Sequence, residues 1–162
     1  MYIHIIVSHD GVRFSMIHIN EVYPKSPSPC TCMNMRRASR AVTQFYDNFL
    51  KPSGLTVTQL SLLRHLEILK QTQIGELAKA LRIDRTTLNR NMKPLLDAGL
   101  IEINPGKDSR TREIILTEKG KDRVALGWKL WKEAQKSIKE YLGEEDLAKL
   151  KQLLLKLEAL QP

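Results

Sequence analysis

The residues in this chain that are best suited to chemistry are hydrogen-bond donors gathered between positions 85 and 93. Their guanidinium, ammonium, hydroxyl and amide groups can donate to the acceptor edges of bases or to phosphate oxygens. We therefore interpret this cluster as a candidate nucleic-acid contact, with a solvated helix face as the open alternative. Its members are Arg85, Thr86, Thr87, Asn89, Arg90 and Lys93.

A second basic group follows in the segment PGKDSRTR, residues 105–112, whose proline and glycine supply turn chemistry. Three cations, from Lys107, Arg110 and Arg112, accompany a single carboxylate. A basic hairpin tip of this size can enter a minor groove, and we place Arg110 at the tip. Asp108 is expected to orient that arginine through a charge-assisted hydrogen bond. The open alternative is a surface hairpin that binds nothing.

The elements around these residues read as two helices and a two-stranded hairpin. The first helix is expected at about Ile74–Leu81 and is followed by a tight connection. In the second helix, Asp84 is the expected N-cap and Gly99 the expected C-cap. Its apolar residues recur at helical spacing, which leaves the donor cluster on the opposite face. These apolar residues are Leu88, Met92, Leu95, Leu96 and Leu100.

Short β-like runs at Ile101–Asn104 and Glu113–Leu116 flank the basic loop. A helix, a tight turn and a second helix that lead into such a hairpin are typical of a helix-turn-helix followed by a wing. The expected fold class is therefore mainly α with a small antiparallel β-wing.

Composition agrees with an anionic partner. The 162 residues include 26 Lys+Arg against 18 Asp+Glu, which gives a formal net charge of +8. Charge alone does not separate DNA from RNA or from an anionic membrane. The chain shows no spanning apolar run and no secretory signal, so we expect a soluble, cytoplasmic protein. No phosphate-binding loop and no set of nucleophile, base and orienting residue is visible, so we expect neither an enzyme nor a cofactor.

The chain is expected to divide into an N-terminal extension, residues 1–29, and a main domain, residues 30–162. In the extension, Tyr2–Ser8 and Val12–Ile19 flank Asp10-Gly11 and predict a β-hairpin, and Lys25–Pro29 reads as a linker. Within the main domain, the winged helix-turn-helix occupies about 55–120. Dimerisation helices are expected at about 33–50 and 118–160, because both regions carry apolar residues spaced by three and four.

Local start and stop signals support these helices. Thr56 and Gln59 form a capping-box pattern, Thr117 is the expected cap of the long helix, and Gly143 is expected to separate it from the last one.

Two residue pairs are candidates for an input signal. Cys30 and Cys32 precede the first long helix, whose positive end favours a thiolate, so redox sensing is one hypothesis and unreactive surface thiols the other. Trp128 and Trp131 are candidates for lining a ligand pocket, although aromatics at helical spacing are more often core residues. No metal site is expected, because the cysteines and histidines lack ligand spacing.

With these pieces in order, the chain resembles the MarR family of winged helix-turn-helix transcriptional regulators. The resemblance rests on IGELAKAL (residues 74–81), on DRTTLNRNMKPLLDAGLI (residues 84–101), on the D-x-R pattern of Asp108 and Arg110, and on the L-T-x-x-G pattern of residues 116–120. The match extends from about Cys30 to Leu157.

The resemblance implies a homodimer whose terminal helices interlock and whose two winged modules read a pseudo-palindromic duplex. By matching position, Thr86, Thr87 and Arg90 would enter the major groove and Arg110 the minor groove. It also implies control of transcription, here predicted to be repression that a small aromatic ligand or an oxidant releases. A winged-helix scaffold for protein interactions is the alternative function. Two features depart from the family pattern, namely Pro94 inside the second helix and the extension ahead of Cys30.

Overall fold

The computed structural model describes residues 5–8, 11–14, 26–106 and 112–160. The chain forms two units, Met1–Gln44 and Phe45–Pro162. The helix α1 (Thr31–Leu50) contributes its first part to one unit and its last turns to the other.

The first unit contains a β-hairpin and the start of α1. Strand β1 (Ile5–Ser8) pairs antiparallel with β2 (Gly11–Phe14), which confirms the predicted hairpin with shorter strands. Ahead of α1, the Asn34 side chain accepts a hydrogen bond from the Ser28 amide at 2.9 Å and donates to its carbonyl at 2.7 Å. These bonds fasten the segment that leads into the helix. The helix begins at Thr31, two residues earlier than the sequence predicted.

The second unit contains the helix-turn-helix. Its helices are α2 (Val57–Leu69), α3 (Ile74–Leu81) and α4 (Arg85–Asp97), preceded by a single 3-10 turn, η1 (Lys51–Ser53). The predicted capping box of α2 is present, since the Thr56 side chain accepts from the Gln59 amide and the Gln59 side chain accepts from the Thr56 amide. Helix α4 continues through Pro94, which is exposed.

The wing belongs to a three-stranded antiparallel sheet in the order β3-β5-β4. Strands β4 (Ile101–Pro105) and β5 (Arg112–Leu116) are each one residue longer than predicted, and Ile103 pairs with Ile114. Strand β3 (Gln71–Gln73), between α2 and α3, was not predicted; it adds to the other side of β5. The wing is therefore hydrogen-bonded to the segment that enters α3.

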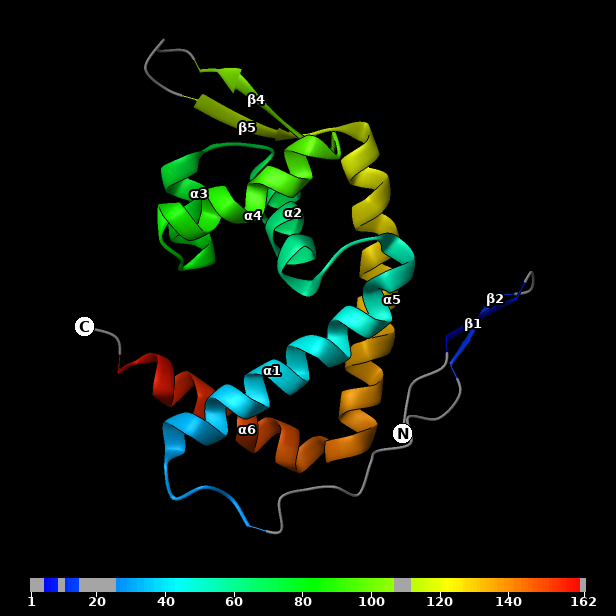
Figure 1. Cartoon of the computed structure of the whole chain (residues 1–162), viewed down its shortest axis with the longest axis vertical. Coiled ribbons are helices and arrows are strands. Elements are labelled where there is room, and N and C mark those ends of the chain that lie inside the picture. The colour runs from blue at the N-terminus through cyan, green and yellow to red at the C-terminus, as the bar shows by residue number, and fades with distance from the viewer. Residues whose placement is uncertain (1–4, 9–10, 15–25, 107–111, 161–162) are drawn as a thin grey trace. The chain divides into compact units, whose positions relative to one another are not determined.

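A long helix, α5 (Glu118–Leu142), runs from the end of β5 to α6 (Glu144–Glu158) (Figure 1). Thr117 caps α5 and Gly143 separates the two helices, as predicted. Helix α5 packs against α2, and Gly127 allows the approach, because a methyl group at that position would lie 2.9 Å from Leu60 Cδ1.

The core of the second unit lies where α2, α3, α4 and β5 meet. Leucines dominate it, as the periodicity predicted for α4, and burial of each stabilises the fold by about 1.5–3 kcal/mol. Residues with at most 1% exposed surface include Leu63, Leu66, Leu77, Leu88, Leu95 and Ile114. This core fixes α4 relative to α3 and the sheet. No helix in the part of the chain that the structure describes is long and apolar enough to cross a membrane.

Candidate nucleic-acid interface

The start of α4 is held by a cap that the sequence predicted. Asp84 Oδ1 accepts a hydrogen bond from the Thr87 amide at 2.8 Å, and Oδ2 accepts from the Thr87 hydroxyl at 2.6 Å. These two bonds lower the pKa of Asp84, because they favour the charged carboxylate. The Thr87 hydroxyl is thus engaged within the protein, while Thr86 beside it is exposed.

The two faces of α4 separate as the periodicity predicted. Leu88, Met92 and Leu95 are buried at 2% exposure or less. The basic and polar residues occupy the outer side, where they remain accessible to a groove; the exposed ones are Arg85, Thr86, Asn89, Arg90 and Lys93. The structure therefore brings five of the six predicted donors to one accessible surface, and their contact with DNA stays a prediction.

The end of α4 is closed by a motif that satisfies its last carbonyls. Gly99 adopts φ +65°, its amide donates to Leu96 O at 2.9 Å, and the Leu100 amide donates to Leu95 O at 2.9 Å. This pair of bonds is a Schellman arrangement, in which a left-handed glycine is preferred. The helix itself ends at Asp97, with Ala98 as its C-cap, so Gly99, the predicted C-cap, lies one position beyond the observed one.

The segment LTEKG, residues 116–120, clamps this end of α4 to the start of α5. Thr117 donates its hydroxyl proton to Gly99 O at 2.9 Å and accepts from the Gly120 amide at 3.0 Å. The Lys119 ammonium donates to Ala98 O at 2.8 Å. Gly120 is required by close approach, since a methyl group there would lie 2.2 Å from Leu100 O. The sequence predicted the Thr117 cap and the L-T-x-x-G pattern, and the structure adds the hydrogen bonds that join this segment to the end of α4.

The turn between α3 and α4 is also tight. Arg82 adopts φ +52°, a left-handed conformation that is uncommon for a residue with a side chain. Its amide donates to Lys79 O and the next amide, that of Ile83, donates to Ala78 O, each at 3.1 Å. The turn thereby sets the direction in which α4 leaves α3.

At the wing, Arg112 is exposed at the start of β5 and pairs with Pro105 across the hairpin. On the other side of β5, the Gln71 side chain donates a hydrogen bond to Glu113. The remaining predicted wing residues, Lys107, Asp108 and Arg110, lie outside the described residues.

The two tryptophans form a stack rather than the lining of an open space. Trp128 and Trp131 are half-buried, with ring centroids 4.4 Å apart and planes inclined by 7°. The Arg64 guanidinium lies 4.4 Å from the centroid of Trp128 and is paired with Glu67. Trp128 is thus in contact with both Trp131 and Arg64. A ligand that stacked on Trp128 would have to displace one of them.

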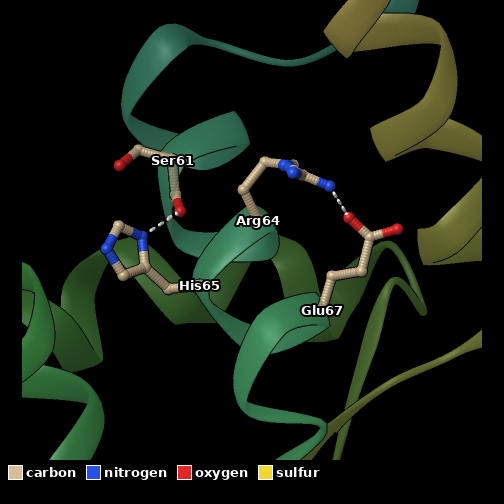
Figure 2. A network of polar contacts seen from close by, with 4 residues as sticks. All are labelled: Ser61, Arg64, His65 and Glu67. Atoms are coloured by element: carbon tan, nitrogen blue, oxygen red, sulfur yellow. Dashed lines mark hydrogen bonds and ion pairs between the residues drawn. The ribbon is translucent and has the colours of Figure 1, made fainter.

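Figure 2 shows the Arg64–Glu67 pair on one side of α2. On the other side, His65 Nδ1 donates a hydrogen bond to the Ser61 carbonyl at 2.8 Å. A shallow pocket of about 280 Å³ lies between α2, the α3–α4 turn and α4. Neither tryptophan contributes to it; its lining is Val57, Thr58, Ser61, Leu62, Leu81, Ile83 and Asn91.

The cysteines lie at the start of α1. Cys30 immediately precedes the helix and its carbonyl accepts the Asn34 amide at 3.2 Å, whereas Cys32 lies in the first turn instead of ahead of the helix. Both thiols are free and exposed.

Comparison with known proteins agrees with this geometry. A sequence model of the MarR family matches residues 53–111, which contain the helix-turn-helix and the start of the wing. The transcriptional regulator MosR of M. tuberculosis, solved in complex with DNA, is 33% identical with a TM-score of 0.70; the match covers 82% of this chain and 99% of MosR.

A variant of MarR from E. coli, solved with operator DNA, is 22% identical with a TM-score of 0.71, and the match covers 78% of this chain and 91% of that one. The family match, the extent of the similarity to MosR and the exposed basic face of α4 lead to one conclusion. The chain belongs to the MarR family of winged helix-turn-helix transcriptional regulators, and it is a DNA-binding regulator rather than an enzyme.

Proposed function

We propose that the protein is a homodimeric repressor that occupies a pseudo-palindromic operator in promoter DNA. The observation that carries this proposal is the face of α4, whose outer residues Asn89, Arg90 and Lys93 are exposed beside the wing while its inner residues are buried. In this docking, Thr86 and Arg90 read base edges in the major groove, Arg85 and Lys93 contact phosphates, and Arg110 and Arg112 of the wing reach the minor groove.

The dimer is supported by α6. None of its described residues is buried, and its leucines expose a large share of their surface, namely Leu150 41%, Leu153 56%, Leu154 47% and Leu155 67%. Contiguous apolar surface of this kind is typical of an interface, and a two-fold interface sets two reading helices one helical turn of DNA apart. We assign this surface of α6 to a second copy of the chain.

The release of DNA is proposed to follow oxidation of Cys30 and Cys32 or binding of a small aromatic ligand near Trp128 and Trp131. Two free, exposed thiols, one just before α1 and one in its first turn, support the oxidant. The half-buried tryptophan stack supports a ligand that takes the place of Trp131 or of Arg64 against Trp128.

Sedimentation velocity combined with footprinting tests the assembly. The wild-type protein is expected to sediment as a dimer and to protect two half-sites about 10 base pairs apart. Leu154→Glu is expected to yield monomers that bind the same DNA far more weakly, whereas the matched control Lys151→Glu, an exposed position on the same helix, stays dimeric. A monomeric wild-type protein, or one that binds duplex DNA no better than an unrelated basic protein, contradicts the proposal and favours an interaction scaffold.

Peroxide titration tests the oxidant. Operator affinity is expected to fall as the thiols oxidise and to be unaffected in a Cys30→Ser, Cys32→Ser variant. Unchanged affinity in protein whose thiols have demonstrably oxidised excludes this switch.

A further inference from the structure

Arg85, the first residue of α4, lies against the first turn of α3. The contact is made at Gly75, the second residue of α3, where the chain has no side chain. A methyl group added at Gly75 would lie 3.0 Å from Arg85 Nη2, 3.7 Å from Cζ and 3.8 Å from Nε. All three of these atoms belong to the guanidinium, so the plane of this group occupies the space that a side chain at position 75 would fill.

Within the described part of the chain, the Arg85 side chain makes neither a hydrogen bond nor an ion pair. In that part of the chain the guanidinium packs against Gly75 and not against a carboxylate. The position is electrostatically unfavourable in isolation, because the N-terminus of a helix carries partial positive charge and a guanidinium is always charged. Such an arrangement becomes favourable when a polyanion lies against both helices, as the phosphate backbone does in helix-turn-helix complexes.

We propose that Gly75 is a positioning residue for DNA binding: by having no side chain, it lets the Arg85 guanidinium lie between the N-termini of α3 and α4 in the orientation that contacts the phosphate backbone. This inference rests on the proposed function, because it takes Arg85 to be a DNA contact. Gly75 acts through Arg85 and touches no base.

A side chain at position 75 is expected to affect the stability of the fold and the affinity for DNA in opposite directions. Gly75 lies in a helix with an ordinary backbone conformation, since it is not among the glycines with positive φ. Replacing a helical glycine by alanine normally stabilises the fold. Gly75→Ala is therefore expected to raise the free energy of unfolding while it weakens DNA binding, because the guanidinium must move by a few tenths of an ångström. Gly75→Gln, a larger good helix former, is expected to displace the guanidinium entirely.

The test is a double-mutant cycle in the full-length chain. Its probe is a fluorescein-labelled duplex selected by the wild-type protein from a random library. Arg85→Ala is expected to weaken binding about tenfold, the size of one charge-assisted contact, and to reduce the salt slope. Gly75→Ala is expected to weaken it about threefold, and Gly75→Gln about as much as Arg85→Ala. In the Arg85→Ala background both substitutions at position 75 are expected to change affinity less than about twofold, since the group they displace is gone.

Each contrary outcome has a separate meaning. If Gly75→Gln weakens binding equally with and without Arg85, the new side chain obstructs DNA by itself and the positioning role is wrong. The role is also wrong if both variants at position 75 fold and bind like the wild type. If Arg85→Ala binds normally, the assignment of Arg85 to the interface fails together with the inference, while DNA binding by the wild type stands. Failure of the wild type to select any duplex overturns the proposed function itself.

Discussion

Arg82 Nη1 lies 2.6 Å from Glu158 Oε2, so the turn of the helix-turn-helix is joined to the last helix across 76 positions of sequence. Both side chains are largely exposed, Arg82 at 73% and Glu158 at 56%. Exposed ion pairs contribute little to the free energy of unfolding, because water and salt screen them. A cycle of Arg82→Gln, Glu158→Gln and the double variant is expected to give a coupling energy of about 0.5 kcal/mol or less at low salt, measured by urea unfolding. The coupling should disappear in about 1 M NaCl. A larger coupling that persists in salt would mean that the pair is a structural joint of the fold.

The cap of α4 gives stability a dependence on pH. Hydrogen bonds from Thr87 lower the pKa of Asp84 below its unfolded value, so its contribution is fully present above the unfolded pKa and is lost as the pH falls through the lowered one. Asp84→Asn keeps an N-cap acceptor without the charge. The difference in unfolding free energy between the wild type and this variant is expected to be larger at pH 7 than at pH 2. If the difference is the same at both pH values, the charged cap contributes nothing.

The close packing of Gly120 at the end of α4 is expected to be sensitive to any added side chain. In Gly120→Ala the new methyl group would lie 2.2 Å from Leu100 O and 2.7 Å from Leu116 Cδ1. The nearer of these atoms belongs to the backbone, whose displacement is costly. We expect a loss of about 1–3 kcal/mol or more in unfolding free energy, together with weaker DNA binding.

The matched control is Gly99→Ala, where the space is open but φ is +65°. Its expected cost is about 1–2 kcal/mol, and Gly99→Asn should recover part of it, because asparagine tolerates the left-handed region. Equal, small effects of both alanine variants would show that close packing at Gly120 does not matter.

Features of the fold that depend on residues close together in the sequence could be predicted, whereas features that depend on distant residues could not. The caps at Thr56, Asp84 and Thr117 were predicted because they involve residues three apart, and the buried face of α4 because its leucines repeat at helical spacing. Strand β3 was missed because its sequence, QTQ, carries no apolar alternation and its partner β5 lies about 40 residues away.

The same limit applies to the site. The exposed donors of α4 were predicted, because amphipathic periodicity assigns them to the face opposite the core. Three other features were not predicted, because residue types and spacing do not specify side-chain or backbone geometry. They are the hydrogen bond from the Thr87 hydroxyl to Asp84, the left-handed conformation of Arg82 and the packing of Arg85 on Gly75.

The Arg64–Trp128 contact is expected to fasten α2 to α5. Arg64→Met removes the charge and keeps most of the alkyl packing, so the expected loss of about 0.5–1 kcal/mol reports the cation–π contact together with the exposed Arg64–Glu67 ion pair. Arg64→Lys is the control, since it retains a cation. Tryptophan fluorescence should change in the methionine variant as one face of Trp128 becomes uncovered. A methionine variant as stable as the wild type would show that the contact is incidental.

The central claim is that α4 reads bases in the major groove while the wing reaches the minor groove and flanking cations contact phosphates. It is tested most directly by DNA affinity across sequence and salt. The measurement is fluorescence anisotropy of the wild type, Arg90→Ala and Arg110→Ala on the selected duplex and on scrambled duplexes, between 50 and 200 mM salt. The account predicts that wild-type affinity falls about a thousandfold over this range. It also predicts that Arg90→Ala loses the preference for the selected sequence, while Arg110→Ala weakens binding to all duplexes alike. Salt-independent binding, or unchanged affinity and preference in both variants, would contradict it.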